Sequence, residues 1–139
     1  MLRDRLAAYY ASMGKEREPA LDRLGDYFHQ DIHFVDPFRD THGMADFRKL
    51  FDRMFKQYRV VEFTGFVGHG DDEAFTLRYQ MRLKMAVGPV FTTDMVSLCR
   101  ARDGKVFELV DVYDMTSSLV SPFGLLRRLY RAIINALFL

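Results

Sequence analysis

Asp36 is the residue of this chain whose position best suits it to proton transfer. It closes a short, mostly apolar segment, residues 31–36, and Pro37 ends a strand there because proline has no N–H to donate. A carboxylate at such a strand end lies at the mouth of a core rather than on a solvated loop. Asp36 is therefore the first candidate for chemistry on a bound molecule.

A structural role for Asp36 is the alternative. Aspartate before proline often ties down a turn, here residues 39–43, and Arg39 or His42 could pair with its carboxylate. Such a partner would favour the charged form and weaken the base. The two interpretations differ in whether Asp36 is free of a salt bridge.

Asp111 is a second acid set among apolar residues. It lies between two valines, and in a strand it shares its face with Leu109 and Tyr113. A carboxylate in such surroundings must find a partner or stay protonated. It forms either a structural bridge to an arginine of a nearby strand or a pocket acid that works with Asp36.

The four histidines form no familiar metal motif. No two share a helix at a four-residue spacing, and on a regular strand His33 points to the face opposite Asp36. A site of two histidines and one carboxylate that includes His29 and Asp36 is the alternative. We expect no metal and no other cofactor.

Composition indicates a globular protein with one core. The 139 residues are 49% hydrophobic and 28% charged, and about 68% of the unfolded surface can be buried at this size. The net charge of +1 gives no reason to expect nucleic acid as a partner. The lone Cys99 excludes an internal disulfide, and charges within residues 3–5 interrupt a secretory signal, so we expect a cytoplasmic protein.

Helices are expected before strands along the chain. Apolar residues at three- and four-residue steps predict helices over residues 2–14, 19–28 and 45–55. Alternation of apolar and polar residues then predicts antiparallel strands over residues 75–85, 90–102 and 105–115. This order is typical of an α+β domain.

A last amphipathic helix is predicted over about residues 122–138. Its apolar stripe lies opposite Arg127, Arg128 and Arg131. The stripe could cover a pocket as a lid, contact a second subunit or lie flat on an anionic membrane surface. We expect it to pack within the protein, with membrane contact as the alternative.

The order of these features resembles the nuclear transport factor 2-like superfamily, which includes SnoaL-like cyclases, ketosteroid isomerases and limonene epoxide hydrolases. The resemblance rests on residues 33–38, on the turn at 42–43 and on the closing strand 109–114, and it spans roughly residues 5–116. It implies a cone-shaped, curved antiparallel sheet wrapped round the N-terminal helices, with an apolar pocket and frequent homodimerisation. The chain would then be one domain over residues 1–139 with an extra C-terminal helix.

Compared with the ketosteroid isomerases, the chain keeps some active-site positions and lacks others. The resemblance matches Asp36 to the general base, and Tyr10 or Tyr9 to the tyrosine that hydrogen-bonds the enolate. It puts Val96 at the place of a protonated acid, although Asp94 shares the face of Val96. A copy of the steroid isomerase is therefore not expected.

At other active-site positions of the superfamily, this chain has only some of the expected residues. Two supporting tyrosines of the isomerases fall on Phe28 and Phe51. In the epoxide hydrolases, the resemblance matches Asp111 to one acid and Arg78 to an arginine, but Gln80 stands in place of the second acid. An amide cannot transfer a proton as a carboxyl does.

We therefore expect a SnoaL-like enzyme without a cofactor that isomerises, cyclises or hydrates an apolar carbonyl compound. Asp36 would be the base, Tyr10 the donor and Asp111 an assisting acid. The alternative is a non-catalytic module that binds a lipid or another apolar small molecule, in contact with a membrane. The expected ligand contacts are Tyr9, Phe28, Phe51, Arg78, Asp94, Val96, Leu109 and Tyr113.

Overall fold

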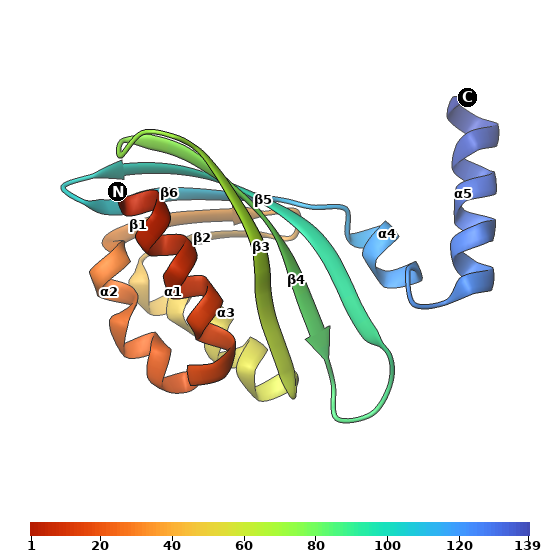
Figure 1. The fold of residues 1–139 in the computed structure, drawn as a ribbon, viewed down its shortest axis with the longest axis horizontal. Coiled ribbons are helices and arrows are strands. Elements are labelled where there is room, and N and C mark those ends of the chain that lie inside the picture. The colour runs from red at the N-terminus through yellow and green to blue at the C-terminus, as the bar shows by residue number, and fades with distance from the viewer.

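The N-terminal helices each bury one apolar face, as their sequence periods predict. The computed structural model describes residues 1–139, and its helix α1 (Leu2–Glu16) buries Leu6, Tyr10 and Met13. A 3₁₀ helix, η1 (Glu18–Arg23), and one helical turn, α2 (Leu24–Tyr27), lead to the first strand. Helix α3 (Met44–Gln57) buries Phe47 and Phe55. Figure 1 shows α1 and α3 on the same side of a curved sheet.

Helix α1 continues past Gly14, where the sequence predicted its end. A Cβ atom at Gly14 would lie 1.9 Å from the carbonyl oxygen of Val61, so glycine here allows α1 to pack closely on a strand. The chain leaves the helix at Arg17, whose φ of 58° is left-handed. The predicted second helix was also too long, because Phe28 already belongs to the first strand.

Six strands form one sheet in the order β2-β1-β6-β5-β4-β3. Their bounds are β1 (Phe28–Asp36), β2 (Arg39–His42), β3 (Val60–Gly70), β4 (Ala74–Lys84), β5 (Val90–Arg102) and β6 (Lys105–Val112). The antiparallel run from β4 to β6 confirms the predicted strands. Strands β1 and β6 instead run parallel, with Val35 opposite Val110. This register brings the ends of β1 and β6, and with them Asp36 and Asp111, to the same part of the sheet.

Strand alternation decides which side chains face the helices. On β4, Leu77 and Tyr79 are buried while Arg78 is exposed, and on β5 Met95 and Ser97 are buried. The sheet bends at β3, whose pairing with β4 shifts register within residues 64–67. Its concave face and helices α1 and α3 enclose the core.

The C-terminal segment departs from the expected packing. The last strand stops at Val112, and helix α4 (Met115–Val120) begins after Asp114, whose carboxylate accepts a hydrogen bond from the N–H of Ser117 at 2.9 Å. Helix α5 (Gly124–Phe138) has the predicted extent but buries no residue. It projects away from the sheet and does not line the cavity, so the expectation that it packs within the protein, as a lid or otherwise, is wrong (Figure 1). None of the helices has the length and apolar character needed to cross a membrane.

Candidate functional site

A cavity of about 190 Å³ lies between the concave face of the sheet and the helices. Of its 20 lining residues, 15 are hydrophobic; these 15 come from α1, α3 and five strands, together with Tyr58, Tyr113 and Met115. The other five are Asp36, Arg39, Arg53, Gln57 and Asp111. Pockets for drug-sized ligands begin at about 300 Å³, so this cavity suits a small, mostly apolar molecule.

Asp111 enters the cavity from β6 at the end of a chain of hydroxyl groups. Cross-strand pairing places it opposite Ser97 of β5, and the Ser97 hydroxyl donates to Asp111 Oδ1 at 2.5 Å. The hydroxyl of Tyr79 lies 3.1 Å from Ser97 Oγ. Because the single proton of Ser97 goes to the carboxylate, Tyr79 donates to Ser97. Asp111 has no arginine partner, so the structural salt bridge that was one of the two predicted alternatives does not form.

The surroundings of Asp111 keep a proton on it at unusually high pH. Burial raises the pKa of Asp111 to about 7, the hydrogen bond from Ser97 lowers the pKa, and the nearby charge of Asp36 raises it. Near neutral pH, the carboxyl is therefore present in both forms in comparable amounts. A group of this kind can both accept and donate a proton.

Asp36 also lines the cavity, but it is held by its own neighbours. Only 4% of its side chain is exposed. Its Oδ1 accepts from the N–H of Phe38 at 2.8 Å, which closes a turn, and its Oδ2 lies 3.4 Å from Arg39 Nη1. The hydroxyl of Tyr113 donates to the same oxygen at 3.4 Å. These are the turn and the salt bridge that the structural interpretation of Asp36 predicted.

Tyr10 supplies a hydroxyl group that no protein group holds. Its ring lines the cavity from α1 and packs against Phe63 and Tyr79 at centroid distances of 5.7 and 5.9 Å. Burial, and then the charges of neighbouring groups including Asp111, raises the pKa of Tyr10 well above its usual range. The hydroxyl therefore keeps its proton at neutral pH and can donate a hydrogen bond to a ligand.

Six of the expected site residues line this cavity, namely Tyr10, Asp36, Phe51, Leu109, Asp111 and Tyr113. Two aromatic residues expected there lie in the core instead. Tyr9 donates from its hydroxyl to the carbonyl oxygen of Ala20 at 2.7 Å and stacks on Tyr27. Phe28 is fully buried, with its ring edge against Phe47. Both side chains support the wall rather than reach the cavity.

Three further expected contacts, Arg78, Asp94 and Val96, lie on the outer face of the sheet. Arg78 pairs directly with Val96, so both side chains point away from the helices, and Asp94 follows the same alternation. The residue opposite Asp111 is Ser97, one position further along the chain than Val96. A shift of one residue exchanges the two faces of a strand.

The sequence-based analysis missed Ser97, Tyr79 and Arg53. Ser97 and Tyr79 are buried and connected to Asp111, and Arg53 lines the cavity from α3. The available signal was the position of Ser97, a small polar residue on the same strand face as Met95 and Cys99. A polar residue on a buried face needs a partner, and the closing strand offered Asp111.

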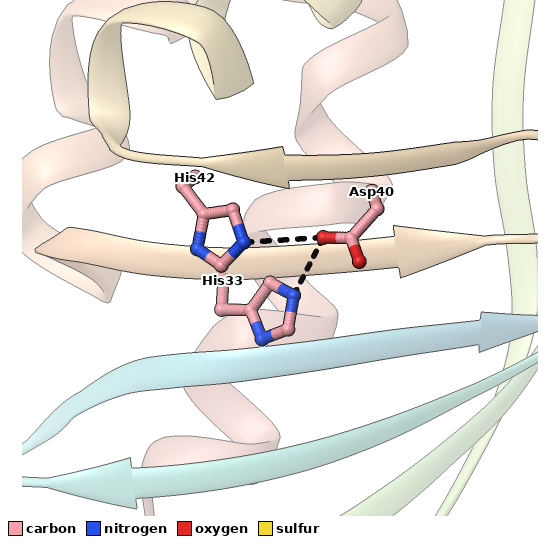
Figure 2. A group of neighbouring side chains, drawn as sticks. All are labelled: His33, Asp40 and His42. Carbon is pink, nitrogen blue, oxygen red and sulfur yellow. Dashed lines mark hydrogen bonds and ion pairs between the residues drawn. The ribbon is translucent and has the colours of Figure 1, made fainter.

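A separate polar cluster lies outside the cavity on β1 and β2 (Figure 2). Asp40 Oδ1 lies 2.7 Å from Nε2 of His33 and 3.3 Å from Nε2 of His42. The two imidazole rings stack with centroids 4.1 Å apart and planes 9° from parallel. Ring nitrogens bind a metal within the ring plane, and parallel stacked rings share no such point. The cluster is therefore arranged for hydrogen bonds, and it does not include His29 or Asp36, which the metal alternative required.

Comparisons with known proteins agree with this architecture. An NTF2-like protein of unknown function from Exiguobacterium is 27% identical, with a TM-score of 0.67 over 83% of this chain and 99% of that chain. A protein with a ketosteroid isomerase-like fold from Catenulispora acidiphila, in complex with trimethylamine, is 20% identical, with a TM-score of 0.71 over 86% and 91% of the chains. A proposed polyketide cyclase from Pseudomonas putida is 16% identical, with a TM-score of 0.72 over 88% and 97%.

The sequence assigns the family of this chain more specifically than these structures do. A search of curated proteins finds no match. The family model described as a SnoaL-like domain matches residues 4–109, which is most of the chain and covers nearly all of α1 and the sheet as far as Leu109. The protein belongs to the SnoaL-like domain family.

Proposed function

We propose that this protein transfers protons on a small, mostly apolar carbonyl compound without a cofactor, and so isomerises, cyclises or hydrates it. The observation that carries the proposal is Asp111, a carboxyl group with a pKa of about 7 on the wall of an apolar cavity. A general base works best when its pKa is near the working pH. Membership of the SnoaL-like family and the likeness to a proposed polyketide cyclase support the same class of chemistry.

The step needs a base and a hydrogen-bond donor on the same cavity. The Asp111 carboxylate takes a proton from the carbon next to the carbonyl group, and the electron pair moves onto the carbonyl oxygen. The hydroxyl of Tyr10 donates a hydrogen bond to this enolate oxygen. Protonated Asp111 returns the proton to another carbon in an isomerisation. In a cyclisation, the enolate carbon attacks a second carbonyl carbon, and protonated Asp111 gives its proton to the alkoxide that forms. In a hydration, Asp111 takes a proton from the attacking water and gives it to the oxyanion left on the former carbonyl oxygen.

We assign the proton transfer to Asp111 rather than to Asp36, the base expected from the sequence. The Asp36 carboxylate is occupied by the turn at Phe38 and by the ion pair with Arg39. Its charge raises the pKa of Asp111. Asp36 therefore acts as a positioning residue that sets the basicity of its neighbour.

Hydrogen exchange tests this proposal without knowledge of the natural substrate. Small cyclic ketones are incubated with the protein in D₂O, and deuterium next to the carbonyl group is followed by NMR. We expect the wild-type protein to accelerate exchange for at least one ketone and Asp111→Asn to abolish this acceleration. Asp94→Asn, which removes an exposed carboxylate from the outer face of the sheet, is the matched control. Equal exchange rates for wild type and Asp111→Asn would overturn the assignment.

Binding without turnover is the second candidate, and the two cavity arginines favour it. Arg39 and Arg53 are the two cations of a mostly apolar lining, and a fatty acid would place its carboxylate there and its chain inside. Mass spectrometry of molecules that co-purify separates the candidates. A fatty acid retained equally by wild type and Asp111→Asn, but lost from Arg53→Gln, indicates a carrier. A carbonyl compound that accumulates only in Asp111→Asn indicates an enzyme.

A further inference from the structure

Helix α5 presents an apolar face that no part of this chain covers. None of its residues is buried, and its large apolar side chains are mostly exposed, up to 81% for Leu125 and 69% for Leu137. In Figure 1, α5 stands apart from the sheet and is joined to it through α4 alone. Exposed apolar surface of this extent on one element marks an interaction site.

The charges of α5 are as unevenly distributed as its apolar residues. When the sequence is wound as a helix, the apolar residues form one broad face, made of Leu125, Leu126, Leu129, Ile133 and Leu137. Arg127 and Arg128 lie near the two borders of this face, and Arg131 lies opposite it. Residues 115–139 contain none of the chain's 19 acidic residues, so nothing in α4 or α5 neutralises the arginines.

We propose that α5 lies flat in the surface of an anionic lipid bilayer. Its apolar face enters the boundary between headgroups and acyl chains, and Arg127 and Arg128 reach the lipid phosphates along its two borders. The 15 residues of α5 extend over roughly 22 Å, which is too short to span the hydrocarbon core of about 30 Å. An orientation parallel to the surface buries the whole apolar face at once.

A lipid surface fits α5 better than a second copy of the chain does. The α5 of a second copy would cover the apolar face but would offer the arginines no opposite charge, because residues 115–139 contain no acidic residue. An anionic bilayer supplies both the apolar interior and the negative charge.

Vesicle flotation of the full-length protein tests the proposal. Vesicles of equal parts phosphatidylglycerol and phosphatidylcholine are compared with vesicles of phosphatidylcholine alone. We expect the wild-type protein to float with the anionic vesicles, to bind neutral vesicles roughly tenfold more weakly, and to lose affinity as salt increases. Because α5 packs on nothing, its variants should keep the fold, which circular dichroism checks.

Two variants of α5 and one control outside it separate the contribution of the apolar face to vesicle binding from that of the arginines. Leu129→Glu combined with Ile133→Glu should lower binding to anionic vesicles roughly tenfold or more. Replacement of Arg127, Arg128 and Arg131 by glutamine should remove the preference for anionic over neutral lipid. Leu98→Glu changes an exposed apolar residue of the outer sheet face and should bind as wild type does.

Three results would overturn the proposal. One is a wild-type protein that does not float with anionic vesicles. Another is a Leu129→Glu, Ile133→Glu variant that binds as strongly as the wild type. The third is a wild-type protein that does not bind vesicles but forms a dimer in light scattering, while the Leu129→Glu, Ile133→Glu variant is a monomer. In that case α5 would be a contact between subunits.

Discussion

Asp111 and Asp40 are both in contact with polar side chains, but they lie on opposite faces of the sheet. Asp111 faces the cavity, where Ser97 donates to it and most of the lining is apolar. Asp40 is exposed on β2, between the imidazoles of His33 and His42 (Figure 2). Burial raises the pKa of Asp111 to about 7. The comparison teaches that the loss of water around a carboxylate raises its pKa and so prepares it for proton transfer.

The largest expected effect is on catalysis. Asp111→Asn keeps the size of the side chain but removes its ability to take a proton, so the enzyme-dependent rate of deuterium exchange should fall about 10²- to 10⁴-fold. Asp40→Asn should leave this rate unchanged because Asp40 does not line the cavity. A similar loss in both variants would mean that the two faces of the sheet do not differ as proposed.

The next effect is on stability as a function of pH. The pKa of Asp111 is raised from 3.8 to about 7 on folding, so from about pH 4 to 7 the folded state holds a proton that the unfolded state has lost. This residue therefore lowers the free energy of unfolding as pH rises through that range, by a few kcal/mol in total. Below about pH 4 it has no such effect.

Urea denaturation at several pH values checks this sign. The free energy of unfolding of the wild type, relative to Asp111→Asn, should decrease from pH 4 to pH 7 and then level off. Asp40→Asn should show the same pH dependence as the wild type. Parallel curves for wild type and Asp111→Asn would contradict the raised pKa.

Ser97 offers a finer adjustment of the same group. Its hydroxyl stabilises the charged carboxylate and so lowers the pKa of Asp111. Ser97→Ala should therefore move the midpoint of the pH–rate profile upward from about 7, on the order of one pH unit. Ser117→Ala in α4, outside the cavity lining, is the control and should not move the midpoint. A midpoint that falls in Ser97→Ala would show that Ser97 does not donate to Asp111.

Asp36→Asn is expected to shift the midpoint of the pH–rate profile downward. The charge of Asp36 raises the pKa of Asp111 less than burial does. Removal of this charge should lower the midpoint of the pH–rate profile by less than one unit. If Asp36 were itself the base, Asp36→Asn would instead abolish the rate, as we expect for Asp111→Asn.

The smallest effect is expected at the exposed cluster. Asp40→Asn removes the acceptor between two imidazoles in water, and exposed ion pairs of this kind stabilise proteins by about 1 kcal/mol or less. Thermal unfolding should show that the free energy of unfolding of Asp40→Asn is lower than that of the wild type by this amount at most. A larger loss would mean that β2 depends on this cluster for its pairing with β1.

Periodicity was sufficient to predict the main elements. The helix that became α3 and the strands that became β4 and β5 follow from their apolar spacing, and alternation placed Asp111 on the same face as Leu109 and Tyr113. The pairing of Asp36 with Arg39 was also among the predicted alternatives. These features depend on residues close to one another in sequence.

The partner of Asp111 could not be predicted in the same way. An unbroken two-residue hairpin at residues 103–104 would pair Asp111 with Val96. The β5–β6 ladder instead shifts by one residue, since Ala101 pairs with Val106 but Arg100 pairs with Glu108. The bulge at Phe107 brings Ser97 opposite Asp111, and no turn signal marks it. The sequence also could not predict that α5 stands apart from the rest of the fold, because an amphipathic stripe does not identify what covers it.

The central claim concerns the proton on Asp111, and its titration is the most direct test. The side-chain carboxyl carbon of Asp111 can be followed by ¹³C NMR from pH 3 to pH 9, with Asp111→Asn used to assign the signal. We expect a midpoint of about 7. A midpoint near 3.8, the ordinary value for aspartate, would show that Asp111 is charged throughout the neutral range and would contradict its role in proton transfer.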